Sequence, residues 1–127
     1  MRRFAAFLLL LGLGCGDSSD GAPIEVTLAD LPCQSVDDVG IWQSAPPPEQ
    51  AVGECTWFLF GANTTFVVEH SLGRTPSVVL GYIGFEADGI GSTLGTGDVL
   101  LHDASTDTAV TIRNNQNQTF YLRLVLF

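Results

Sequence analysis

Lysine is absent from this chain of 127 residues, and only five arginines oppose fourteen aspartates and glutamates. The formal net charge is −9 at pH 7. Such a surface repels nucleic acids and anionic lipid headgroups, because proteins bind phosphates mainly through lysine and arginine. The composition therefore predicts no nucleic-acid partner, and any attachment to a membrane needs an anchor other than a basic patch.

Long apolar runs and helical periodicity are also missing. The longest apolar run, residues 4–13, is too short to span a bilayer, which takes roughly 20 residues. No segment repeats its apolar residues at helical spacing over three turns. Extensive disorder is excluded too, because 46% of the residues are hydrophobic and many of these are β-branched or aromatic.

The N-terminus has the three parts of a secretory signal peptide: two arginines, the apolar run and a small residue, Gly14. Because Cys15 follows, residues 1–14 resemble a bacterial lipoprotein signal, in which cleavage leaves a lipidated N-terminal cysteine. Gly12 and Gly14 also fit the small-x-small rule of an ordinary signal peptidase. A secreted soluble protein is therefore the alternative to lipidation at Cys15 and attachment to the cell envelope.

The chain has three cysteines, and their number favours lipidation. Ordinary cleavage would leave an odd thiol in an oxidising compartment, whereas lipidation of Cys15 leaves Cys33 and Cys55 as a pair. We expect these two to form a disulfide; two free thiols are the alternative. The lipoprotein resemblance also implies the outer membrane, because Gly16 stands where enterobacterial lipoproteins retained in the inner membrane have aspartate.

Beyond the signal, the sequence predicts a tether over residues 15–23 and one all-β domain over 24–127, whose first part, 24–55, is an irregular, proline-rich lead-in. Pro46-Pro47-Pro48 can enter neither a helix nor a central strand. About seven short antiparallel strands indicate a β-sandwich or a small barrel, and we expect the sandwich. The predicted strands are 24–28, 56–60, 65–70, 77–85, 99–102, 109–113 and 119–127.

The last strand alternates clearly between two faces. Phe120, Leu122, Leu124 and Leu126 share one face, which we expect to be in the core. The glycine-rich stretch 88–97 is expected to be a surface loop. Tyr82 and Phe85 at its base are expected to be buried, with an exposed aromatic platform as the alternative.

The two histidines, His70 and His102, are the residues from which a hydrolytic site could be built. A serine (Ser71 or Ser105) and an aspartate (Asp98, Asp103 or Asp107) would complete a triad. The chain has no G-x-S-x-G motif, and neighbours on a strand point to opposite faces. We therefore expect both histidines to close strand ends through ring hydrogen bonds and the protein to be non-enzymatic. A small envelope hydrolase using His70 or His102 is the alternative.

Acidic residues around the glycine-rich loop are the candidate ligand-binding groups. The spacing matches neither a phosphate-binding loop nor a calcium loop, so no metal or cofactor is predicted. Weak calcium binding is an alternative, and a cationic or hydroxyl-rich partner suits the carboxylates better than a phosphate. The candidates are Glu86, Asp88, Asp98 and Asp103.

Residues 66–79, FVVEHSLGRTPSVV, carry a resemblance that extends over about residues 64–127. The segment resembles the V-x-H-x-L-G-R-x-P-x-x-V strand-turn-strand of small β-domains in phage tail and virion fibre proteins, which often end with a V-T-I-R-N strand, a polar turn and a final apolar strand. In that turn Gly73 would supply a positive φ. The resemblance implies a sandwich used for attachment or assembly and carries no catalytic residues. The expected function is a binding or surface-structural module for a glycan or a protein.

Overall fold

The computed structural model describes residues 21–127. The predicted signal peptide, most of the predicted tether and Cys15 lie outside the described residues. Within residues 21–127 the chain forms ten β-strands and three short 3-10 helices. None of the helices in this part of the chain has the length and apolar character needed to cross a bilayer.

The first sheet has four strands, in the spatial order β2-β6-β10-β9. Its two central strands pair antiparallel over their whole length, from Ala109 opposite Glu69 to Asn114 opposite Thr64. The short β2 runs parallel to β6, with Ile24 opposite Phe66. The strands are β2 (Ile24–Val26), β6 (Thr64–Glu69), β9 (Leu101–Ser105) and β10 (Ala109–Asn114).

The second sheet has six strands and is built around the C-terminal strand β11 (Phe120–Leu126). Strand β7 pairs along one edge of β11. On the other edge β5 pairs with the first half of β11 and β4 with its end. The other strands are β3 (Ser35–Val36), β4 (Trp42–Gln43), β5 (Phe58–Phe60), β7 (Val79–Gly84) and β8 (Thr93–Leu94).

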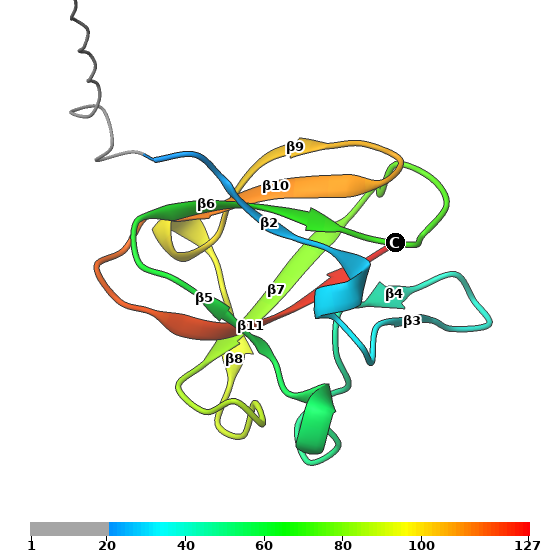
Figure 1. Cartoon of the computed structure of the whole chain (residues 1–127), viewed down its shortest axis with the longest axis horizontal. Helices are drawn as coiled ribbons and strands as arrows, with labels where there is room; N and C mark the ends of the chain where they lie inside the picture. Colours follow the sequence, from blue (N-terminus) through cyan, green and yellow to red (C-terminus); the bar gives the residue numbers. More distant parts are fainter. Residues whose placement is uncertain (1–20) are drawn as a thin grey trace, which may run out of the picture.

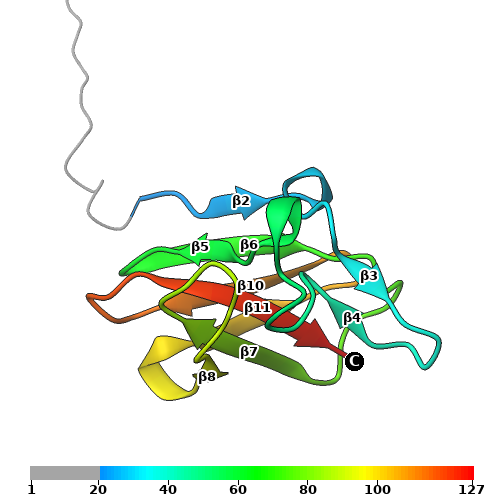
Figure 2. The same cartoon turned by 90° about the horizontal axis from the view of Figure 1, so that it is seen from below.

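The two sheets lie face to face and enclose the core, so the fold is all-β and sandwich-like (Figures 1 and 2). As predicted, Phe120, Leu122, Leu124 and Leu126 are buried, the last three completely. The opposing sheet contributes the alternate residues of β6 and β10, which are Phe66, Val68, Val110 and Ile112. The period-two alternation of apolar residues therefore determines which face of each long strand is buried.

Two details of the predicted sandwich are wrong. Residues 21–127 contain ten strands rather than about seven, because β3, β4 and β8 have two residues each and are too short to show alternation. The remaining seven correspond to the seven predicted segments. The strands are also not all antiparallel, since β2 pairs parallel to β6. That pairing joins segments far apart in the sequence, which no local pattern reports.

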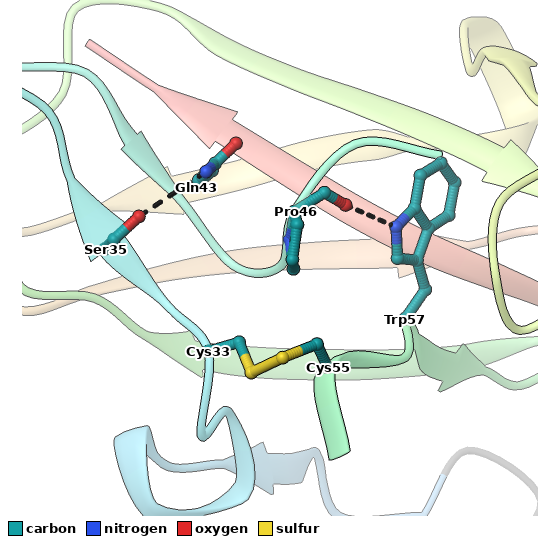
Figure 3. The surroundings of a disulfide bond; sticks show 6 residues. All are labelled: Cys33, Ser35, Gln43, Pro46, Cys55 and Trp57. Carbon is teal, nitrogen blue, oxygen red and sulfur yellow. Dashed lines mark hydrogen bonds between the residues drawn. A yellow bond between two sulfur atoms is a disulfide. The ribbon is translucent and has the colours of Figure 1, made fainter. Parts of the chain in front are cut away.

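The predicted disulfide between Cys33 and Cys55 is present, with 5.2 Å between the two Cα atoms (Figure 3). It joins the chain after the 3-10 helix η3 (Leu28–Asp30) to the last residue of η4 (Gly53–Cys55). The closed loop contains β3, β4 and residues 45–51, which we call the proline-rich segment because they include Pro46-Pro47-Pro48. The lead-in 24–55, expected to be irregular beyond its first strand, thus also includes two short strands of the second sheet, β3 and β4.

Candidate functional site

The acidic residues Glu86 and Asp88 lie in the loop that follows β7. The N–H of Gly89 donates to the backbone oxygen of Glu86 at 3.0 Å, and the N–H of Ile90 donates to Oδ1 of Asp88 at 3.0 Å. The Asp88 carboxylate therefore stabilises the turn through a local side-chain to backbone bond. Glu86 is exposed.

Asp98 and Asp103 belong to the segment that enters the first sheet. Asp98 lies in the 3-10 helix η5 (Gly97–Val99), and its backbone oxygen accepts the N–H of Asn115 at 2.8 Å. Asp103 lies on the edge strand β9 at a β-bulge, because His102 and Ala104 pair with consecutive residues of β10 and Asp103 pairs with none. Both side chains are exposed. Within residues 21–127 no three His, Cys, Asp or Glu residues form a group that could hold a metal ion.

The glycine-rich loop is fastened to the proline-rich segment by Trp57, which is 2% exposed. The backbone N–H of Trp57 donates to the oxygen of Ala87 at 2.9 Å, and its indole N–H donates to the oxygen of Pro46 at 2.9 Å (Figure 3). Gly89 has φ +77°, and a Cβ atom at this position would overlap the Trp57 ring. The two loops therefore hold each other in place.

The proline-rich segment covers part of the outer face of the six-stranded sheet. Ala45 and Ala51 are buried with Trp57, and the half-buried Tyr82 and Tyr121 of the sheet pack against them. This second, small apolar cluster was not predicted from the sequence. The sequence feature that could have predicted this cluster is the proline run a few residues before a tryptophan, because extended proline segments pack well on aromatic rings.

Arg123 projects from β11 into the same region. Its Nε–H donates to the oxygen of Ala45 at 2.9 Å, Nη2 donates to Oε1 of Gln43 at 2.6 Å, and the guanidinium lies 5.5 Å from the centre of the Tyr82 ring. Burial lowers the pKa of Arg123 by desolvating the charged form, and Tyr82 acts in the opposite direction. The guanidinium thus links β4, β7 and the start of the proline-rich segment.

His70 follows β6 directly and is 3% exposed. Its Nδ1 accepts the N–H of Leu72 at 3.1 Å, and its Nε2 lies 3.1 Å from the oxygen of Thr106. A neutral ring with the proton on Nε2 satisfies both bonds. The imidazole therefore joins two turns at one end of the molecule, which confirms the prediction that His70 closes a strand end.

His102 is exposed, and its Nε2 lies 2.7 Å from Oγ of Ser105. Residues three apart on a regular strand face opposite sides of the sheet. The bulge at Asp103 adds one residue, so His102 and Ser105 face the same side. Ser105 pairs with Val110 and His102 with Ile112, and these two partners both point into the core. Cross-strand partners share a face, so the bulge places the serine and the histidine side by side.

Two other residues of the possible triad, Ser71 and Asp107, are hydrogen-bonded to other side chains. The hydroxyl of Ser71 donates to Oε1 of Gln34 at 2.7 Å, and Oδ1 of Asp107 accepts the hydroxyl of Thr75. Among the described residues no carboxylate is hydrogen-bonded to the ring of His102. The structure of residues 21–127 contains no pocket.

Comparisons with protein-family models, with curated proteins and with solved structures found no match to this chain. The resemblance of residues 64–127 to virion attachment domains stays a prediction. One local expectation that it carried is confirmed, because Gly73 has φ +87° in the turn between β6 and β7.

Proposed function

We propose that this chain is a lipoprotein of the bacterial cell envelope, anchored at Cys15, whose sandwich-like domain is a non-enzymatic binding or surface-structural module. The observation that carries the proposal is the disulfide between Cys33 and Cys55. It accounts for two of the three cysteines and suits an oxidising compartment. The remaining cysteine follows the apolar run at the point where a lipoprotein signal is cleaved.

The fold also favours an anchor at one end of the domain. Ile24 of β2 lies opposite Phe66 near the start of β6, so the chain enters the domain at the end that holds the turn between β10 and β11. Six peptide units separate Cys15 from Gly21, a span of about 20 Å at most. A lipid at Cys15 would hold the domain close to the outer membrane, with the turn after His70 at the opposite end.

The partner of the module is a glycan or a protein. Its loops are supported by a rigid scaffold, as is common in binding proteins. Three of the predicted ligand-binding carboxylates, on Glu86, Asp98 and Asp103, are exposed and can accept hydrogen bonds from hydroxyl or ammonium groups.

The bonds of His70 support a non-enzymatic function. Both of its ring nitrogens face backbone groups, so this histidine has no free nitrogen for proton transfer.

Metabolic labelling with a palmitate analogue tests the anchor. We expect the wild type to be labelled and to sediment with outer membranes, and we expect Cys15→Ser to lose both properties. The double variant Cys33→Ser/Cys55→Ser is the matched control, because it removes cysteines and keeps the proposed lipidation residue. Equal labelling of Cys15→Ser and the wild type would refute lipidation at this residue.

A second candidate function, a small envelope hydrolase, is favoured by the contact between His102 and Ser105. In this mechanism His102 Nε2 takes the proton from the Ser105 hydroxyl as the oxygen attacks an ester carbonyl, and gives it to the alcohol that leaves. Water then hydrolyses the acyl-serine and restores the Ser105 hydroxyl. Hydrolysis of a series of p-nitrophenyl esters separates the two functions. Activity that disappears in both Ser105→Ala and His102→Ala, with unchanged circular dichroism, would establish the hydrolase. A binding module has no activity for these substitutions to remove.

A further inference from the structure

The side-chain amide of Gln34 is held in one orientation by two hydrogen bonds. Its Oε1 accepts the indole N–H of Trp42 at 2.6 Å and the hydroxyl of Ser71 at 2.7 Å. An indole nitrogen can only donate, so the amide atom that faces it is the oxygen. The two N–H bonds of Nε2 lie on the other side of the amide, and neither donates to a residue within 21–127.

The backbone around Gln34 is fixed as well. The N–H of Gln34 donates to the oxygen of Leu31 at 3.0 Å, and the preceding residue, Cys33, is bonded to Cys55. Trp42 is completely buried, so the group that orients the amide belongs to the core. A ligand that accepts hydrogen bonds from Nε2 therefore has little side-chain entropy to remove.

Asp107 presents an acceptor in a neighbouring turn. Its Oδ1 accepts the hydroxyl of Thr75 at 2.5 Å, whereas Oδ2 has no hydrogen bond to another described residue. His70 joins the two turns, because its N–H donates to the oxygen of Thr108 at 2.9 Å and its Nε2 lies 3.1 Å from the oxygen of Thr106. The exposed carboxylate of Asp107 is thus attached to the turn that also contacts Gln34.

Arg74 lies between these two groups along the turn. It is next to Thr75 and three residues from Ser71, so its Cα atom is at most about 11 Å from that of Ser71. Its side chain is exposed. Within residues 21–127 it is the one arginine without a hydrogen bond, because Arg113 and Arg123 are both bonded to other residues. We refer to Gln34, Arg74 and Asp107 as the Gln34 site.

The turns 70–75 and 106–108 expose no large apolar side chain. The largest exposed one in residues 21–127 is Phe85, which is 69% exposed and lies at the other end of the domain, with its ring 5.5 Å from that of Phe120. The expectation that Phe85 is buried in the core is therefore wrong, because β7 ends one residue earlier. Interfaces between proteins are centred on apolar and aromatic anchors, which these two turns lack.

We infer that the Gln34 site binds a neutral glycan. A sugar hydroxyl both donates and accepts hydrogen bonds, so its binding site needs acceptors and donors close together. Gln34 and Arg74 supply donors, and Asp107 supplies the acceptor. The net charge of −9 opposes an anionic polysaccharide. This inference rests on the proposed binding function, and it names the class of ligand and the place where the ligand binds.

The position of the Gln34 site agrees with the proposed anchor. The turn after His70 lies at the end of the domain opposite the point where the chain enters it. A domain held at Cys15 would therefore present the site away from the membrane. A short oligosaccharide that lies across two exposed turns needs no deep pocket.

The test uses the soluble mature chain, residues 15–127 with Cys15→Ser, so that its outcome does not depend on lipidation. The probes are three neutral oligosaccharides: maltohexaose, cellohexaose and chitotetraose. We expect at least one of them to bind saturably at millimolar concentration. In ¹⁵N spectra the shift changes should fall on the side-chain amide of Gln34 and on the backbone of Arg74 and Asp107.

Two nearly isosteric variants test the hydrogen bonds. Gln34→Glu keeps an acceptor for Trp42 and Ser71 and replaces the two N–H donors by an oxygen, so we expect binding about tenfold weaker. Asp107→Asn keeps the acceptor for Thr75 and turns the free oxygen into a donor, and we expect a loss of about three- to tenfold.

Gln118→Glu is the matched control for the added charge. Gln118 is exposed in the turn between β10 and β11, at the end of the domain opposite the Gln34 site, and its amide donates only to the oxygen of Thr119. We expect this variant to bind like the wild type. Backbone spectra establish that each variant is folded. If Gln34→Glu does not fold, Arg74→Ala replaces it, because this substitution removes no hydrogen bond between described residues and should still weaken binding by about two- to fivefold.

Four results would overturn the inference. None of the three neutral probes could bind, or a hexamer of galacturonate could bind more tightly than all of them. Gln34→Glu and Gln118→Glu could weaken binding equally, which would leave only the effect of added charge. The shift changes could fall at Glu86 and Asp98 instead of the Gln34 site. This last result would refute the inference and leave the proposed binding module standing.

Discussion

Gly89 lies so close to the indole ring of Trp57 that no side chain fits between them. Its φ of +77° is also in the region that L-residues rarely adopt. The contact joins the loop after β7 to the segment before β5, and the backbone bond from Trp57 to Ala87 reinforces it. This glycine therefore fixes both the position of the loop and the orientation of the residues on either side of it.

Replacing Gly89 by alanine is expected to lower the free energy of unfolding by about 2–4 kcal/mol, because the methyl group displaces the Trp57 ring and the backbone is strained. Gly91→Ala is the control. Gly91 has φ +79°, but nothing lies within 4 Å of a Cβ atom there, so only the strain of about 1 kcal/mol is expected. Urea denaturation monitored by tryptophan fluorescence measures both values. Equal losses would show that the ring contact contributes nothing.

The two histidines are expected to differ in their effect on stability. His70→Ala removes a buried ring and leaves the N–H of Leu72 and the oxygen of Thr106 without their partner, at a cost of about 2–4 kcal/mol. His102→Ala removes an exposed ring from an edge strand and should change stability by less than about 0.5 kcal/mol. Thermal unfolding followed by circular dichroism measures both. A His70→Ala variant as stable as the wild type would contradict the role of the ring.

Much of the sandwich could be predicted from the sequence, because its long strands obey a local rule. Phe120, Leu122 and Leu124 alternate with half-exposed residues, and every second side chain of a strand points to the same face. The disulfide was also predicted from the sequence, because assigning Cys15 to the expected lipidation left Cys33 and Cys55 as the one pair. Neither inference needed knowledge of which strands are neighbours.

The remaining features depend on contacts between distant segments. Phe85 was expected in the core because it ends an apolar run, but β7 ends at Gly84 and the ring lies beyond the sheet. The proline-rich segment packs on Tyr82 and Tyr121, a contact between distant segments that the linear pattern does not report. The contact between His102 and Ser105 needs a β-bulge, which follows from the pairing of β9 with β10 and not from residue spacing.

Glu49 offers a position where a substitution should stabilise the protein. It has φ +77° in a turn closed by the bond from the N–H of Gln50 to the oxygen of Pro47 at 3.1 Å. Glycine adopts this conformation without strain, so Glu49→Gly is expected to raise the free energy of unfolding by about 0.5–1 kcal/mol. Gln50→Gly is the control. Its backbone φ is not positive, and the added freedom of the unfolded chain should make this variant slightly less stable. The opposite order in chemical denaturation would contradict the assignment of strain to Glu49.

The disulfide between Cys33 and Cys55 is expected to contribute about 3 kcal/mol to the free energy of unfolding, because it closes a loop of 22 residues in the unfolded chain. The double variant Cys33→Ser/Cys55→Ser should lose this amount of unfolding free energy in urea denaturation.

Hydrogen exchange should show which segments of the domain are destabilised when the disulfide is absent. We expect faster exchange at Trp42, Ser44 and Trp57, whose segments lie inside or next to the closed loop, and little change at Val68 and Val110 in the first sheet. Wild-type protein treated with dithiothreitol is the matched control and should behave like the double variant. Uniformly faster exchange in both sheets would instead mean that the disulfide stabilises the whole sandwich, and that the proline-rich segment is not held separately.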